Sequence, residues 1–236
     1  MSGGRYAMVL AAGKGRRLGA IGERTPKPLV RVAGKPLLDH VLDELDAGGV
    51  TDAVVNVHHL AAQVRDHLAA RAPGATPRVT ISDETAQLLE TGGGVVKALP
   101  LLRDETFLLA ASDVIRTGDG VRVLLAEWDA ARMDALMLLY PSETAVGFEG
   151  AGDFFLEDTG RLARRGSAPA APFVYTGLLI CHARLYAGAP VGPFSNNLVW
   201  DRAIAAGRLF GVVHARACYH VGTPAAIAAA QQALGD

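Results

Sequence analysis

The chain has 236 residues and a mass of 24.6 kDa; half of its residues are apolar and a fifth are charged. This composition excludes general disorder and a coiled coil, and it predicts one folded domain over residues 1–236. With 23 Lys and Arg against 24 Asp and Glu, the net charge is −1. Because there is no basic excess to neutralise phosphates, we expect neither nucleic acid nor a membrane as a partner.

Cysteine usage and the start of the chain indicate the compartment. The two cysteines, Cys181 and Cys218, are too few for a disulfide framework or a thiolate metal cage. The first residues contain one short apolar stretch that soon becomes glycine-rich and basic, so it is too brief for a signal peptide core or a membrane span. We therefore expect a protein of the reducing cytoplasm.

Short apolar runs alternate with amphipathic helical patterns along the first half of the chain. The runs at 7–11, 53–57 and 107–111 have the length of buried parallel strands. After Pro36, apolar residues repeat at helical spacing until Gly48, and a shorter stripe of this kind lies near 124–128. Strands and helices in this order predict right-handed crossovers and an α/β sandwich covered on both faces.

The pattern changes after Tyr140. Residues 141–173 are rich in Gly, Pro and charge, and Asp158-Thr159-Gly160 marks a turn, so we expect an insert that carries a hairpin. Regular structure is predicted to resume with a strand at 174–181, a helix near 196–206, a strand near 209–214 and a terminal helix from Pro224. Trp128 and Trp200 have apolar neighbours at helical spacing and are predicted to lie in the core.

A glycine-rich loop follows the first predicted strand. Its small residues would let backbone amides approach a phosphate, and the basic side chains that follow suit a polyphosphate. It is not a P-loop, because no G-K-[ST] closes it, and Leu18 takes the place of the third glycine of a dinucleotide fingerprint. On its own the loop is equally typical of an ordinary turn. The candidate phosphate-binding residues are Ala11, Ala12, Gly13, Lys14, Gly15 and Arg17.

A second segment follows, in which Pro26 and Pro28 stiffen the backbone on either side of Lys27. Together, LAAGKGRRL and TPKPLVRVAGKPLLDH resemble the sugar-phosphate nucleotidylyltransferases. The resemblance implies a Rossmann-like three-layer sandwich with a mostly parallel mixed sheet. It also implies transfer of a nucleotidyl group from a nucleoside triphosphate to a sugar 1-phosphate, with release of pyrophosphate.

Three further segments extend the resemblance. LETGGG, at 89–94, is similar to the turn that reads the base in this family; it implies roles for Leu89, Thr91 and Gly92 and is expected to open a helix at Val95. The run 108–114 ends in a carboxylate, Asp113, which resembles the metal-binding Asp of the family.

The segment 219–224 resembles the W-x-D-V-G-T motif of the family, but His220 stands where the second metal-binding carboxylate is expected. Two interpretations of His220 stay open: it ligates the metal, or it is only a polar group with its own partner. The other histidines have no metal-ligand spacing, so a dedicated zinc site is not expected.

This reaction needs positioned charge more than a catalytic base. The second pKa of a phosphate monoester is about 6, so the attacking oxygen is already ionised at neutral pH. The resemblance assigns Arg17 to the β- and γ-phosphates, Lys27 to the α-phosphate and the sugar phosphate, and Asp113 to Mg²⁺, with Mn²⁺ as a possible substitute.

The segments 152–154 and 175–177, with LETGGG, resemble the uridylyltransferases that act on N-acetylmuramate 1-phosphate in bacterial cell-wall recycling. This implies UTP and that sugar phosphate as substrates, with Asp153, Thr176 and Gly177 on the sugar side. A mannose-1-phosphate guanylyltransferase and a non-catalytic binder of nucleotide sugars remain the alternatives. The sequence makes no prediction of the oligomeric state.

Overall fold

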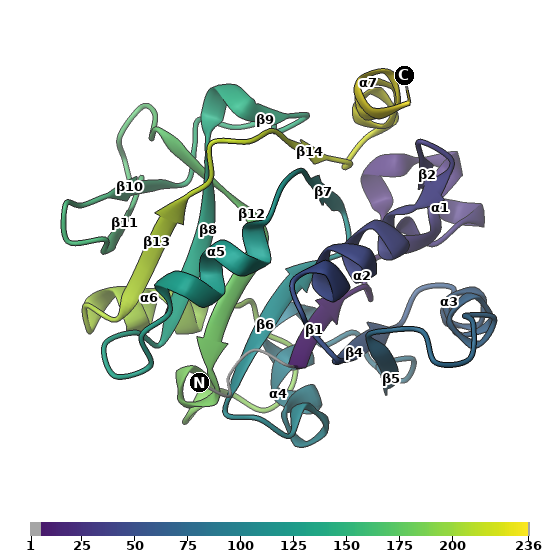
Figure 1. Ribbon diagram of the computed structural model, residues 1–236, viewed down its shortest axis with the longest axis horizontal. Helices are drawn as coiled ribbons and strands as arrows, with labels where there is room; N and C mark the ends of the chain where they lie inside the picture. Colours follow the sequence, from purple (N-terminus) through teal and green to yellow (C-terminus); the bar gives the residue numbers. More distant parts are fainter. Residues whose placement is uncertain (1–5, 236) are drawn as a thin grey trace.

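The computed structural model describes residues 6–235, and within them a nine-stranded sheet forms the centre of the molecule (Figure 1). The order is β11-β10-β12-β6-β1-β4-β5, and β8 pairs with both β12 and β13. Strands β1, β4, β5 and β6 are mutually parallel, β13 is parallel to β8, and β12 is antiparallel to β6 and β8. The predicted mostly parallel mixed sheet is confirmed. The strands are β1 (Tyr6–Leu10), β4 (Asp52–Val57), β5 (Arg78–Asp83), β6 (Thr106–Ala111), β8 (Ala135–Pro141), β10 (Phe154–Leu156), β11 (Leu162–Arg164), β12 (Phe173–His182) and β13 (Leu209–Val213).

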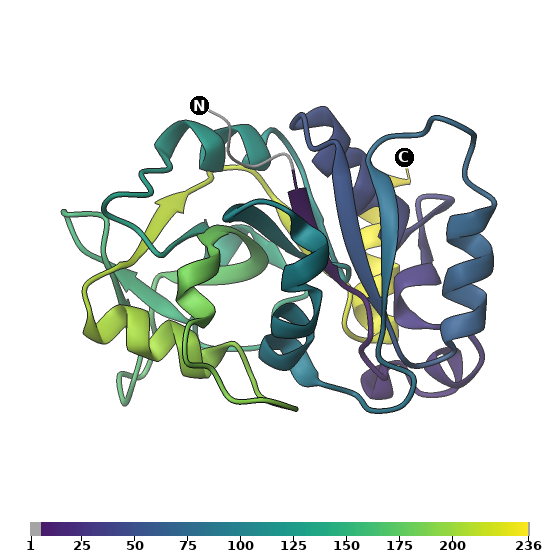
Figure 2. The same cartoon turned by 90° about the horizontal axis from the view of Figure 1, so that it is seen from below.

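Helices cover both faces of the sheet, which confirms the three-layer sandwich. Figure 2 shows α2 and α5 on one side of the sheet and α4 and α6 on the other. The apolar residues of α3 belong to the same core cluster as those of α2 and α5. The helices are α2 (Leu37–Ala47), α3 (Ala61–Ala69), α4 (Glu90–Leu102), α5 (Gly120–Glu127) and α6 (Asn197–Ala205).

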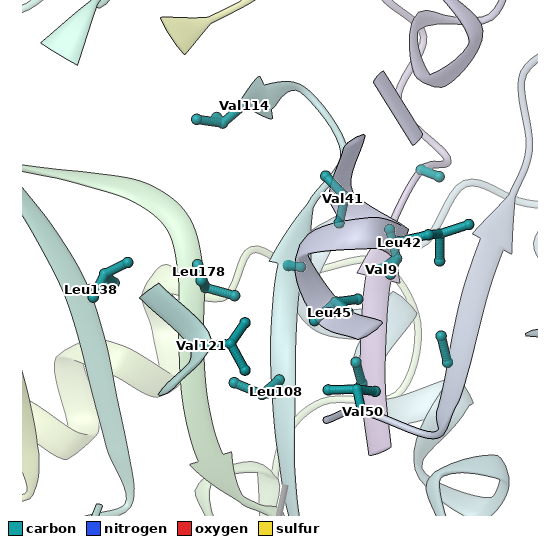
Figure 3. Packing of buried hydrophobic residues seen from close by; sticks show 14 of the residues in the cluster. Val9, Val41, Leu42, Leu45, Val50, Leu108, Val114, Val121, Leu138 and Leu178 are labelled. Carbon is teal, nitrogen blue, oxygen red and sulfur yellow. The ribbon is translucent and has the colours of Figure 1, made fainter. Parts of the chain in front are cut away.

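Strand β1 shows why the predicted strands are continuous apolar runs. Ala7 and Val9 belong to the core cluster under α2, whereas Met8 belongs to the cluster under α4, and all three are fully buried. A strand covered on both faces has no polar side to present. Figure 3 shows Leu42 of α2 beside Val9 of this strand; Val41 and Leu45 of α2 belong to the same cluster.

A small second sheet closes one end of the molecule. It consists of β7 (Val114–Arg116), β14 (Cys218–His220) and β9 (Ala145–Val146), and the terminal helix α7 (Pro224–Leu234) follows it. This helix is confirmed where it was predicted. Pro224 is its first residue, and the Thr223 hydroxyl caps it by accepting a hydrogen bond from the Ala226 N–H. Near it lie α1 (Ala20–Arg24), β2 (Arg31–Val32) and β3 (Lys35–Pro36).

Two expectations need correction, and one is confirmed. The helix expected at Val95 begins at Glu90, so the glycine run lies inside α4. The expected hairpin is present: β10 and β11 turn at 158–160, and because β10 pairs with β12, the hairpin extends the central sheet. Trp128 and Trp200 are partly buried and pack against the two main core clusters without lying inside them.

Across residues 6–235, no helix combines the length and the hydropathy that crossing a membrane requires. Both cysteines are buried and unpaired.

Candidate active site

The site is centred on Asp113, in the two-residue turn between β6 and β7. The next residues form β7, whose antiparallel pairing with β14 places His220 opposite Val114. The Val221 N–H donates to the carbonyl of Asp113 over 2.8 Å, which fixes the two segments side by side. Two side chains then meet one carboxylate oxygen of Asp113: Lys27 Nζ lies 2.7 Å from Oδ2 and His220 Nε2 lies 3.5 Å from it.

These neighbours keep Asp113 ionised. Burial acts to raise the pKa of this carboxyl, but the nearby His220 imidazole and the charge of Lys27 outweigh burial and hold the pKa well below its usual range. Pro26 and Pro28 frame Lys27, as the sequence indicated, and the residues 27–29 form a short 3-10 turn. The backbone that carries the Lys27 ammonium is therefore conformationally restricted.

Three cavities meet at Asp113. The first has a volume of about 400 Å³ and lies between the ends of β1 and β6 and the start of α4. The second, of about 440 Å³, lies over the glycine-rich loop. The third, of about 200 Å³, lies between β7, β12 and β14. Asp113 borders all three, and Lys27 borders the first two.

The glycine-rich loop joins the first cavity to the second. Its first residues, Ala11, Ala12 and Gly13, line the first cavity, and the stretch 13–17 lines the second. Gly15 adopts φ +61°, a left-handed conformation that favours glycine, and it begins the short 3-10 turn of residues 16–18. Arg17 is exposed and lies beside Gly222, because a Cβ at that glycine would be 3.3 Å from the Arg17 Cζ. The loop residues predicted to bind phosphate thus share one surface with Lys27.

A buried polar chain ties this loop to the segment before α4. The Ala11 N–H donates to Asn56 Oδ1 over 2.7 Å, and Asn56 Nδ2 donates to Glu84 Oε1 over 2.7 Å. The other oxygen of Glu84 accepts the Leu89 N–H over 3.0 Å, and Glu84 has no exposed surface. Sequence reasoning missed Asn56 and Glu84. The available signal was a polar residue interrupting or following an apolar strand.

The three glycines 92–94 each make room for a different neighbour. A Cβ at Gly92 would lie 2.3 Å from the Phe194 ring, one at Gly93 would lie 2.2 Å from the Gly192 carbonyl oxygen, and one at Gly94 would lie 2.7 Å from Glu84 Oε1. Close packing therefore accounts for the glycine run.

The first turn of α4 is capped by a distant loop. The Phe194 carbonyl accepts the N–H groups of Gly92 and Gly93, over 2.8 and 3.2 Å. Thr91 lines the first cavity, and its hydroxyl accepts the Asn196 N–H over 2.9 Å. Leu89 and Gly92, which were predicted to bind the nucleotide, are not among the residues that line the three cavities. Ser195 lines the cavity beside Thr91 and was not predicted.

The third cavity contains two of the three predicted sugar-side residues. Thr176 and Gly177 line it, together with the apolar side chains of Val114, Ala145 and Phe148. The Thr176 hydroxyl oxygen is buried and has no hydrogen-bond partner within residues 6–235. Asp153 does not border the cavity. It accepts the Tyr175 N–H over 3.0 Å, and burial raises the pKa of its carboxyl.

The described residues contain no group of three or more His, Cys, Asp or Glu side chains that would hold a metal. Asp113 and His220, which lie 3.5 Å apart, are the candidate protein donors. One carboxylate is enough for Mg²⁺ when substrate phosphates and water complete its oxygen shell. The residues present therefore fit a divalent ion that arrives with a nucleotide.

Comparison with known proteins agrees with this geometry. Residues 7–233 match the family described as the MobA-like NTP transferase domain. The chain belongs to this family. It is 44% identical over 236 residues to N-acetylmuramate alpha-1-phosphate uridylyltransferase of Caulobacter vibrioides, and the match covers 98% of each protein. The enzyme of that name from Neisseria meningitidis is 44% identical over 111 residues, which are 46% of this chain and 47% of that protein.

Solved structures share the fold at lower identity. The structure of HddC from Yersinia pseudotuberculosis complexed with GMP-PN superposes with a TM-score of 0.80 at 19% identity, covering 97% of this chain and 98% of that one. The inositol-1-phosphate CTP transferase of T. maritima gives a TM-score of 0.76 at 17% identity, with 100% and 98% covered. At these identities the likeness establishes the fold, and it confirms the predicted α/β class.

Proposed function

We propose that the protein transfers the uridylyl group of UTP to N-acetylmuramate 1-phosphate, giving the nucleotide sugar and pyrophosphate. The observation that carries the proposal is the meeting of three cavities at Asp113, beside the Lys27 ammonium. Such a junction suits a nucleoside, a triphosphate and a sugar phosphate that must come together at one phosphorus. The full-length relative from Caulobacter supports the choice of base and sugar.

The chain supplies alignment and positive charge. The sugar phosphate attacks the α-phosphorus, the bond to the β-phosphate oxygen breaks, and pyrophosphate leaves with the electron pair. No side-chain base is needed, because the attacking oxygen is already ionised. In our assignment Lys27 holds the α-phosphate and the sugar phosphate, and Arg17 with the loop amides holds the β- and γ-phosphates. Fixed cations of this kind stabilise charge in the transition state.

We assign the divalent ion, Mg²⁺ or Mn²⁺, to Asp113, with His220 as a second donor. When bound, the ion neutralises phosphate charge and orients the reacting oxygens. Before it binds, Lys27 neutralises the Asp113 carboxylate through the 2.7 Å contact. The ammonium is then already at the place where phosphate oxygens arrive.

The third cavity is assigned to the sugar. Its apolar lining suits an N-acetyl methyl group, and the unpaired Thr176 hydroxyl offers a hydrogen bond to a polar group of the sugar. Asp153 takes part indirectly, because its carboxylate holds the Tyr175 N–H next to Thr176. We further propose that the reaction takes place in the cytoplasm, as a step of cell-wall recycling.

The test is a substrate panel with pyrophosphate release as the readout. UTP, GTP, CTP and dTTP are each combined with the 1-phosphates of N-acetylmuramate, N-acetylglucosamine and mannose, with and without Mg²⁺. We expect turnover to require the metal and to be highest for UTP with N-acetylmuramate 1-phosphate. The D113N variant should be inactive, whereas D158N, in the exposed β10–β11 turn, should match the wild type.

Two results would replace the proposal. A tenfold preference for GTP with mannose 1-phosphate would favour a guanylyltransferase. Tight binding of nucleotide sugars without turnover of any pair would favour a non-catalytic binding protein.

A further inference from the structure

A buried ion pair lies behind the third cavity. Arg116, at the end of β7, contacts Glu44 of α2 through both Nε, 3.0 Å from each carboxylate oxygen, and Nη2, 2.8 Å from Oε2. The two side chains are only 1% and 11% exposed. Neither residue lines a cavity near Asp113. The assigned reaction therefore gives this pair no direct role.

The remaining face of the guanidinium reaches the cavity wall. Arg116 Nη1 donates to the Thr176 carbonyl over 2.9 Å. At this point β12 is irregular: its register with β8 shifts between Tyr175 and Leu179. Gly177 has φ +79°, and a Cβ there would lie 2.4 Å from the Ala111 Cβ. Arg116 thus bonds a carbonyl at the point where the strand leaves its regular pairing.

The position of Arg116 in the chain makes this bond important. Asp113 lies just before β7, and Arg116 ends this three-residue strand. The proposed metal ligand therefore lies next to one end of this short strand. The residue at its other end bonds the wall of the third cavity, where we place the sugar. Glu44 fixes the guanidinium in orientation, because both of its oxygens accept from Nε, while the buried Nη2 lies close to Oε2 without a hydrogen-bond partner among the described residues.

We propose that Arg116, oriented by Glu44, is a positioning residue that holds Thr176 against the third cavity and so sets the affinity for the sugar 1-phosphate. The inference rests on the function proposed above. It separates the two substrates, because the first and second cavities make no contact with this pair through their linings. Loss of the contacts that Arg116 makes with Glu44 and Thr176 is expected to weaken sugar binding and to leave nucleotide binding intact.

A purely structural role is the competing explanation, and three variants distinguish it. R116K keeps the charge but loses the planar fork that bonds Glu44 and Thr176 together. E44Q keeps the shape of the partner and removes its charge. The double variant E44M/R116M removes both charges at once, which avoids leaving one charge buried without its partner. R78M is the control for the loss of an arginine–carboxylate pair outside the site: Arg78, on β5, is exposed and donates to both carboxylate oxygens of Asp52, on β4.

The measurements are KM for each substrate, kcat, and calorimetric binding of the sugar 1-phosphate to the metal-free protein. We expect R116K and the double variant to raise KM and the dissociation constant for the sugar 1-phosphate at least tenfold, with KM for UTP within twofold of wild type. E44Q should raise the sugar KM about threefold. R78M should change neither KM.

Equal increases in both KM values, or unchanged sugar binding in the variants that fold, would overturn the inference. If R116K fails to fold, E44Q and the double variant decide the question. An inactive wild-type enzyme would reject the proposed function instead, and the two failures are therefore distinguishable.

Discussion

The Asp113 carboxylate has two unequal neighbours. The Lys27 contact is short, at 2.7 Å, and is a charge-assisted hydrogen bond, whereas His220 lies at 3.5 Å, beyond an ordinary hydrogen bond. Lys27 and Asp113 are 86 positions apart in the chain, and both had been identified from their own short motifs. Their direct contact is the new information, because it means that one group neutralises the other until substrates arrive.

Replacement of Lys27 by methionine tests the role of its charge. K27M keeps most of the side-chain volume and removes the ammonium, so transition-state charge loses a fixed partner. We expect kcat/KM to fall about 10²- to 10³-fold, the range for loss of one electrostatic contact in an active site. K35M is the control, because Lys35 is exposed and pairs with Asp43. Steady-state pyrophosphate release checks the prediction, and more than a third of wild-type activity in K27M would contradict it.

Replacement of His220 by aspartate tests the metal assignment. A carboxylate is a better donor for Mg²⁺ than a neutral imidazole, so H220D should lower the Mg²⁺ concentration for half-maximal rate and narrow any advantage of Mn²⁺. In metal-free protein the new carboxylate would face Asp113, and like charges should lower Tm. Added Mg²⁺ should then raise Tm more in H220D than in wild type. Identical metal titrations in both proteins would show that His220 has no part in metal binding.

At the scale of elements, the helix α4 shows where local rules fail. Glycine is among the poorest helix formers, so a run of three predicts a turn and a helix that starts after it. The structure starts the helix at Glu90 because the loop 192–196 caps its first turn and fills the space that side chains would occupy. These partners lie about a hundred positions away in the chain. No local pattern carries that information.

The packing of Gly92 gives a prediction at this scale. G92A places a methyl group 2.3 Å from the Phe194 ring, so we expect a loss of about 1–3 kcal/mol in the free energy of unfolding, typical of overpacking. KM for UTP should rise as well. Displacement of the Phe194 ring would shift Gly92 and with it the neighbouring Thr91, which lines the first cavity. The double variant G92A/F194L, with a smaller ring-free side chain, should recover part of both losses. Urea unfolding and steady-state kinetics measure them, and a double variant no better than G92A would reject this explanation.

At the scale of the whole molecule, the sequence predicted what depends on a repeating pattern or a contiguous motif. The buried strands, the helix faces and the residues Lys27 and Asp113 are of this kind. The residues that support the site belong to no such pattern or motif. Asn56 with Glu84 and Arg116 with Thr176 each join segments that meet only after the sheet has formed. The residues beside them in the sequence form no motif that marks these positions. They are identified only by the contacts that the fold creates.

Asp134 connects three strand ends at one edge of the molecule. It precedes β8, and its Oδ1 accepts hydrogen bonds from Arg184, after β12, and Arg208, before β13, over 2.6 and 2.8 Å. Burial acts to raise the pKa of the Asp134 carboxyl, but the two arginines outweigh burial and lower the pKa. A carboxylate with a lowered pKa in the folded state stabilises the fold above its unfolded pKa of about 3.9, and this contribution is lost as the pH falls through the folded value.

The D134N variant therefore has a specific dependence on pH. At pH 7 we expect it to lose about 1–2 kcal/mol in the free energy of unfolding, because two charge-assisted hydrogen bonds become neutral ones. As the pH falls through the lowered pKa of the wild-type carboxyl, that group is itself protonated, so the difference between the proteins should shrink. D201N is the control, since Asp201 is exposed and its pair with Arg164 should contribute less than about 1 kcal/mol. Urea titrations at a series of pH values measure this difference in the free energy of unfolding. If the difference stays constant as the pH is lowered, the charge of Asp134 does not hold these strand ends together.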